Sequence, residues 1–153
     1  MAAPEALFYH LERQPLDHVL PLLVERTLER GWKSVIQAGT LAQVTALDAL
    51  LWSYREDSFL PHGTKSDGKA ERQPVYLTDG ADTPNAAEVR FLVDGAIAAD
   101  FAAHQRYVYL FDGGNAAALA GARQQWKAAK AAACVLTYWQ QSEAGKWEKK
   151  ASG

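Results

Sequence analysis

The sequence predicts an α/β domain in which a largely parallel sheet is layered by helices on both faces. Short apolar runs rich in β-branched and aromatic residues alternate with longer segments whose apolar residues recur every three or four positions. Such alternation builds parallel sheets with helical crossovers. The length of 153 residues and the apolar content of 48% suit one domain with a sizeable core. No repeat or linker divides residues 1–153, so we expect a single Rossmann-like domain.

The first half of the chain is predicted to run strand, helix, strand, helix. Residues 6–11 (ALFYHL) form an apolar, aromatic run typical of a strand. The next helix has Asp17 as its expected N-cap, which keeps Pro21 in the first turn, and Gly31 closes it. A second strand (33–38) and a second amphipathic helix (41–54) follow.

The second half is predicted to supply the remaining strands and two more helices. Residues 55–63 are irregular in pattern, and residues 64–73 are polar and glycine-bearing, as in an exposed loop. The expected elements that follow are strands at 75–78, 89–93 and 107–111, a short helix around 97–104, a long helix that ends at 130, and a last strand at 134–139. The polar tail at 141–153 is expected to fray.

The long helix carries the most informative pattern in the chain. Asn115 is a suitable N-cap, and the alanine-rich body favours helix. One stripe along it is apolar and includes Trp126, while Arg123, Lys127 and Lys130 form a cationic stripe beside the first. No acidic residue lies between Gly113 and Gln141 to neutralise these cations. Spacing alone favours a core tryptophan beside a solvated charged face, and it leaves open a site for a short acidic peptide with an apolar end.

Composition narrows the classes of function. The formal net charge of −2 disfavours a protein that coats nucleic acid electrostatically. Cys134 is the single cysteine, so no internal disulfide can form and a cytoplasmic protein is expected. The chain shows no signal peptide, lipidation signal or apolar run of membrane length.

Rossmann-like folds usually bind nucleotides, but this sequence lacks the motifs that bind their phosphates. The turn after the first strand (residues 10–14) has no glycine, and the turn after the second has one glycine without a following Lys-Ser/Thr pair. Asp79, Asp94 and Asp112 each end a predicted strand and precede glycine, where catalytic acids and magnesium are found in such sheets. Asp-Gly is also a common way to leave a strand. The histidines match no metal-binding spacing, so we expect no metal or cofactor.

Two segments resemble the chi subunit family of bacterial DNA polymerase III. The family shows a tryptophan after a helix and then Ser-Phe-apolar-Pro-His, which here is Trp52 followed by residues 58–62 (SFLPH). It also shows Phe-Tyr in an opening strand, matched by residues 8–9, and a late helix of the form Ala-Arg-x-x-aromatic-Lys, matched by residues 122–127. The resemblance covers nearly the whole chain in order.

The resemblance implies a non-catalytic accessory subunit of the clamp-loader assembly. Chi-type proteins connect the polymerase to single-stranded DNA-binding protein (SSB) by gripping its acidic tail, which ends in Pro-Phe. Arg123, Trp126 and Lys127 match the tail-binding helix of the family, and Lys130 is added from helical spacing. The region of Trp52 and Phe59 matches the surface on which the family docks the small subunit psi. The alternative is that these two aromatic side chains only pack the corner between the helix and the following loop. The charged loop at 64–73 and the alanine-rich helices depart from the better-known members.

Two other functions stay open at this point. A magnesium-dependent nucleotide enzyme would use Asp79, Asp94 or Asp112. Direct binding of single-stranded DNA would use the cationic helix and Trp126, which the near-neutral net charge disfavours.

Overall fold

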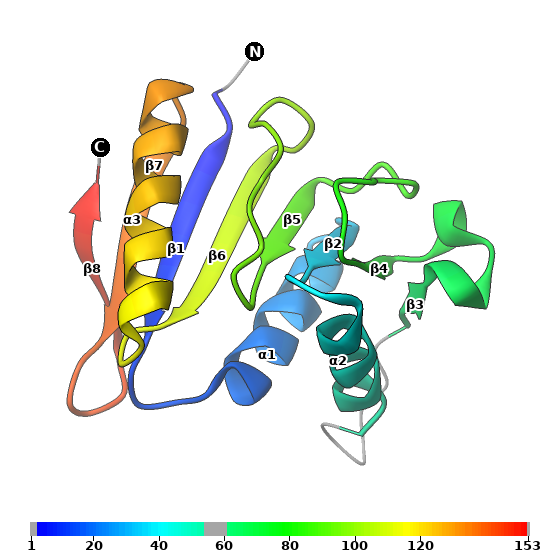
Figure 1. Cartoon of the computed structure of the whole chain (residues 1–153), viewed down its shortest axis with the longest axis horizontal. Helices are drawn as coiled ribbons and strands as arrows, with labels where there is room; N and C mark the ends of the chain where they lie inside the picture. The colour runs from blue at the N-terminus through cyan, green and yellow to red at the C-terminus, as the bar shows by residue number, and fades with distance from the viewer. Residues whose placement is uncertain (1–2, 54–60, 153) are drawn as a thin grey trace.

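A computed structural model describes residues 3–53 and 61–152 of the chain. These residues form eight strands and three α-helices (Figure 1). The strands are β1 (Glu5–Leu11), β2 (Ser34–Gln37), β3 (Gly63–Thr64), β4 (Val75–Thr78), β5 (Val89–Leu92), β6 (Arg106–Asp112), β7 (Val135–Gln141) and β8 (Trp147–Ser152). The helices are α1 (Leu16–Glu29), α2 (Leu41–Ser53) and α3 (Ala116–Ala131), and two 3₁₀ turns, Lys65–Asp67 and Ala70–Arg72, follow β3.

The strands form one sheet in the order β3-β4-β2-β5-β6-β1-β7-β8. Every neighbouring pair is parallel except β7 and β8. The connection from β1 to β2 through α1 runs toward the β3 edge of the sheet. The connection from β6 to β7 through α3 runs toward the opposite edge, at β8. The predicted fold class is therefore confirmed: α/β with a largely parallel sheet.

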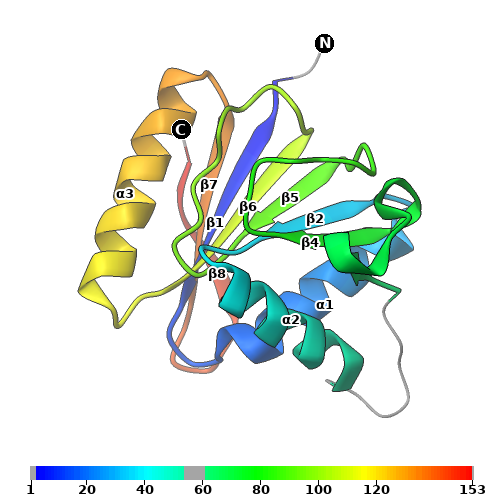
Figure 2. The same cartoon turned by 45° about the vertical axis from the view of Figure 1, so that its right-hand side comes forward.

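Helices cover both faces of the sheet, as predicted (Figure 2). α1 and α2 pack with one face of the strands into the larger apolar core, to which Leu20, Val24 and Leu51 contribute fully buried side chains. α3 packs on the opposite face through Ala122 and Ala129, over β1, β6 and β7. No helix in the described ranges has both the length and the hydropathy that crossing a bilayer requires.

The segment between β5 and β6 does not form the short helix predicted around residues 97–104. Three of its backbone N–H groups are bonded to other parts of the chain: Gln125 Oε1 accepts the Ala98 N–H at 3.3 Å, and the Tyr107 hydroxyl accepts the N–H groups of Ala103 and His104. Phe101 packs against the core under α3. Because these partners lie outside the segment, an irregular conformation leaves none of these three N–H groups without an acceptor.

Two other local predictions were wrong. The tail at 141–153, expected to fray, contributes β8, which pairs antiparallel with β7, and Trp147 packs against the core. The N-cap of α1 is Pro15 instead of Asp17, so Pro21 lies in the second turn of the helix. Gly31 does terminate α1, with φ of 81° and its N–H bonded to the Leu28 carbonyl.

Candidate functional site

α3 presents the four predicted residues on one side. Asn115 caps the helix through a 2.9 Å hydrogen bond from the Ala118 N–H to its side-chain oxygen, as predicted. Arg123, Trp126, Lys127 and Lys130 lie at relative positions 0, 3, 4 and 7, which places them on one stripe of the helix. The three cations are exposed. We call this stripe, together with Tyr138 of β7, the α3 face.

Trp126 is half-buried and belongs both to the core and to the surface. Its ring meets Phe8 of β1 at 5.2 Å and Tyr138 at 6.0 Å, both in edge-to-face geometry. Phe8 in turn stacks on Tyr109 at 4.5 Å. These contacts hold the Trp126 ring in one orientation, so its exposed part is a rigid apolar surface beside Arg123.

Arg123 lies close enough to Tyr138 to affect its ionisation. Burial raises the pKa of the Tyr138 phenol, and the nearby Arg123 guanidinium partly offsets that rise. Within residues 3–53 and 61–152, neither Arg123 nor Lys127 or Lys130 takes part in an ion pair. The N–H donors of the Arg123 guanidinium are therefore available to a ligand.

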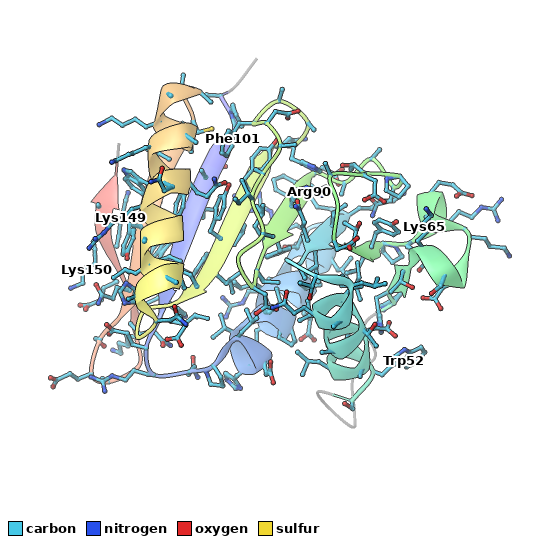
Figure 3. All side chains as sticks on the ribbon, viewed as in Figure 1. Trp52, Lys65, Arg90, Phe101, Lys149 and Lys150 are labelled. Atoms are coloured by element: carbon cyan, nitrogen blue, oxygen red, sulfur yellow. The ribbon has the colours of Figure 1, made fainter. Side chains whose placement is uncertain are left out.

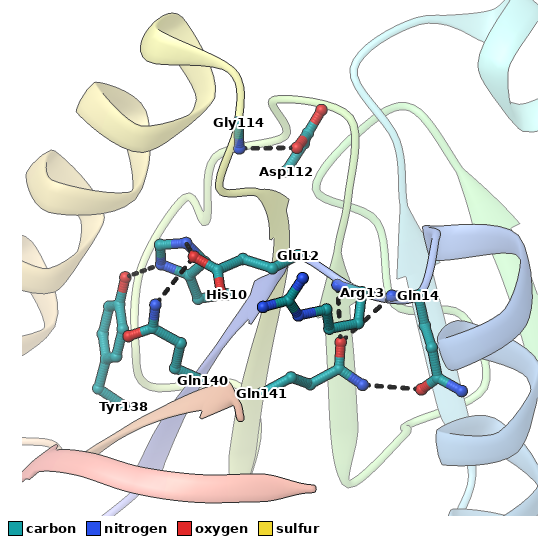
Figure 4. Close-up of polar contacts among 9 residues, drawn as sticks. All are labelled: His10, Glu12, Arg13, Gln14, Asp112, Gly114, Tyr138, Gln140 and Gln141. Atoms are coloured by element: carbon teal, nitrogen blue, oxygen red, sulfur yellow. Dashed lines mark hydrogen bonds and ion pairs between the residues drawn. The ribbon is translucent and has the colours of Figure 1, made fainter. Parts of the chain in front are cut away.

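A hydrogen-bonded cluster supports Tyr138 from behind (Figure 4). His10 Nδ1 lies 2.6 Å from the Tyr138 hydroxyl, and His10 Nε2 lies 3.1 Å from a Glu12 carboxylate oxygen. The same Glu12 oxygen accepts a 2.9 Å hydrogen bond from Gln140 Nε2. Glu12 thus accepts a hydrogen bond from Gln140 and lies beside His10, and among the described residues it forms no ion pair with Arg123.

His10 and Tyr138 were missed by the sequence reasoning. The first strand and the last strand before the tail are 128 positions apart at this contact, and only their parallel pairing aligns Phe8 with Tyr138 and His10 with Gln140. A polar histidine in an apolar strand was the one available signal, since a buried histidine needs a partner.

A separate cleft of about 1070 Å³ opens at the carboxyl ends of β1, β5 and β6. Asp94 and Asp112 both line it, whereas Asp79 does not. Burial and the nearby Asp17 carboxylate raise the pKa of Asp94. The cleft lies along a different side of α3 from the α3 face, since Gly121 and Gln125 line it but Arg123 and Trp126 do not.

The predicted catalytic aspartates are therefore only partly brought together. Asp112 accepts the Gly114 N–H at 2.8 Å, as in an ordinary turn. Asp94 and Gly95 both have positive φ, and Ala96 N–H bonds the Val93 carbonyl, which makes this Asp-Gly pair the centre of a tight turn. In the part of the chain that the structure describes, no three His, Cys, Asp or Glu side chains are grouped to hold a metal ion.

Trp52 lies at the far end of the molecule from the α3 face (Figure 3). It occupies the last turn of α2 and is 59% exposed, and its ring meets the buried His62 at 5.1 Å. Much of the Trp52 side chain is therefore accessible to a partner. Phe59, the second predicted residue of this surface, lies outside the described residues.

Substitution of Arg123 by alanine should raise the pKa of Tyr138. Loss of the adjacent positive charge removes an interaction that favours the phenolate. The shift can be followed by NMR titration of protein labelled with ¹³C-tyrosine, with Tyr138→Phe to assign the signal. The other tyrosines should titrate as in the parent chain, and an unmoved Tyr138 signal would place Arg123 away from it.

Comparison with known proteins supports the motif-based assignment. Residues 3–137 match the family described as DNA polymerase III chi subunit, HolC. A probable DNA polymerase III subunit chi from Rickettsia prowazekii (strain Madrid E) is 30% identical over 103 residues, which are 67% of this chain and 62% of that protein. The chain thus spans less than two thirds of the length of this relative. With most of the chain inside the family match, this protein belongs to the DNA polymerase III chi subunit family.

Proposed function

We propose that the chain is a non-catalytic accessory subunit of the DNA polymerase III holoenzyme that binds the acidic C-terminal tail of SSB through the α3 face. In this role it links SSB to the clamp loader during replication. The observation that carries the proposal is Arg123, an exposed guanidinium without an ion pair among the described residues, beside the rigid aromatic pair of Trp126 and Tyr138.

The chemistry of the α3 face matches that of such a tail. A terminal α-carboxylate is best held by the bidentate fork of an arginine, here Arg123. The terminal phenylalanine ring can pack on the exposed part of Trp126, and the aspartates of the tail need only the diffuse charge of Lys127 and Lys130. One charge-assisted hydrogen bond contributes about 1.5–3 kcal/mol. Together with one partly buried phenyl ring, this suggests micromolar-class affinity.

We further propose Trp52 as part of a second docking surface, for a clamp-loader subunit such as psi. The support is its exposure of 59% at the end of α2, remote from the α3 face. Two separate surfaces are what a linking subunit requires, since each partner must be held while the other is bound.

A fluorescence-polarisation titration with a labelled acidic peptide ending in Pro-Phe tests the tail site. We expect saturable binding that weakens as salt rises, because exposed charges are screened beyond about 10 Å at 0.1 M ionic strength. The same peptide without its last residue should bind far more weakly. Trp52→Ala is the matched control and should bind like the parent chain. Equal binding of both peptides would contradict a site for the terminal phenylalanine.

A further inference from the structure

One side of the sheet has no helix over its last three strands. α1 contacts β2 and β6, and α2 contacts β3 and β4, whereas β1, β7 and β8 extend the sheet beyond α1 (Figures 1 and 2). α3 lies on the opposite side. On the uncovered side, Val135 at the start of β7 is 53% exposed. This half of the sheet therefore presents side chains directly to its surroundings.

Three half-buried aromatic side chains meet on this uncovered side, and a fourth, Trp32, lies just after α1. Tyr9 of β1 stacks on Trp139 of β7 at 6.4 Å with the rings 15° from parallel, and it meets Trp147 of β8 edge-on at 5.1 Å. Arg106 connects Trp32 to this group. Its guanidinium lies 5.3 Å from the Trp32 ring, and its positive charge partly offsets the rise that burial causes in the pKa of Tyr9. We call Tyr9, Trp32, Trp139 and Trp147 the aromatic strip.

The charges around the aromatic strip are mainly positive. Arg26 of α1 and Arg30, the C-cap of this helix, are four residues apart and so share one side of it. The positive charge of Arg26 partly offsets the rise that burial causes in the pKa of Tyr9, and Arg30 stacks on Trp32 at 4.1 Å. Lys149 of β8 lies directly across from Trp139 in the strand pairing. Among the residues that the structure describes, Arg106 pairs with an acid, Glu5, at 3.3 Å, and Arg26, Arg30 and Lys149 do not.

We propose that the aromatic strip binds single-stranded nucleic acid, with bases stacked on its rings and phosphates held by Arg26, Arg30 and Lys149. Flat aromatic side chains flanked by cations are the combination that single strands require, because every base offers a face for stacking and every phosphate a charge. An acidic protein segment would use the cations but would leave the rings without stacking partners.

Few phosphates can be neutralised here, so the affinity is low and strongly dependent on salt. A weak contact of this kind gains effect when a second site holds the partners together, because tethering raises the effective concentration. This increase in effective concentration depends on the proposed SSB-tail site. Binding of single-stranded nucleic acid to the aromatic strip does not depend on it.

The test uses the full chain and a labelled oligothymidylate of about 12 nucleotides at low salt, without SSB. Binding is expected with quenching of tryptophan fluorescence, because bases stack on indole rings. The double variant Arg26→Gln/Lys149→Gln should bind about tenfold more weakly, with the slope of log K against log salt reduced by about 0.7 for each cation removed. The matched control Lys127→Gln/Lys130→Gln on α3 should bind like the parent.

Three outcomes would overturn the proposal. The parent chain fails to bind at low salt, the α3 control loses as much affinity as the strip variant, or poly-glutamate displaces the oligonucleotide while the fluorescence stays unquenched. The second outcome would place the nucleic acid on α3, and the third would assign the strip to an acidic protein. None of these results depends on whether the SSB tail binds, so the two proposals fail separately.

Discussion

Replacing Arg123 by alanine should weaken binding of an acidic peptide ending in Pro-Phe by about 10- to 150-fold, the equivalent of one charge-assisted hydrogen bond of about 1.5–3 kcal/mol. The guanidinium is exposed and has no ion pair among the described residues, so its loss removes a ligand contact but no ion pair of the described fold. The melting temperature should stay close to that of the parent. Fluorescence polarisation and thermal denaturation on the same samples measure both quantities.

Two further variants separate geometry from charge. Arg123→Lys keeps the charge but lacks the planar fork, so we expect an affinity between those of the parent and the alanine variant. Arg72→Ala removes an exposed arginine of the second 3₁₀ turn, beyond the opposite end of the sheet, and should leave peptide binding unchanged. If Arg72→Ala costs as much as Arg123→Ala, the peptide senses overall charge and the α3 face is not its site.

Gly113→Ala should be among the most destabilising single substitutions in this chain. A Cβ at Gly113 would overlap the buried His10 imidazole. The ring would have to leave the position in which it contacts the Tyr138 hydroxyl and Glu12. Overpacking of this kind, with loss of a buried hydrogen bond, costs about 2–4 kcal/mol in the free energy of unfolding. Urea denaturation measures the loss, and because Tyr138 lines the α3 face, peptide affinity should fall as well.

Gly121→Ala is the matched control for this substitution. A Cβ at Gly121 meets no atom within 4 Å, and the residue lies inside α3, so alanine should stabilise the chain by about 0.5–1 kcal/mol. Combining Gly113→Ala with His10→Ala removes the overlap, so the pair should cost less than the sum of the two single variants. Additive losses would mean that the overlap with His10 is not the source of the instability.

Local pattern was enough to predict most of the elements and the helix that carries the site. A short polar side chain followed by alanines predicts that the helix begins after Asn115, and Asn115 does cap α3 there. The strand at 75–78 was predicted with its observed bounds. The segment between β5 and β6 was predicted wrongly because three of its N–H donors are bonded to Gln125 and Tyr107, which no local pattern reveals.

The chain's own residue order was sufficient to establish the α/β class, the absence of a phosphate-binding loop and the stripe of cations on α3, because each depends on neighbours within a few positions. The environment of that stripe depended on the fold. Parallel pairing of β1 with β7 brings His10 to Tyr138, and the same register aligns Tyr9 with Trp139 on the opposite side of the sheet. Contacts between residues about 130 positions apart are set by strand order, and strand order is a property of the folded sheet.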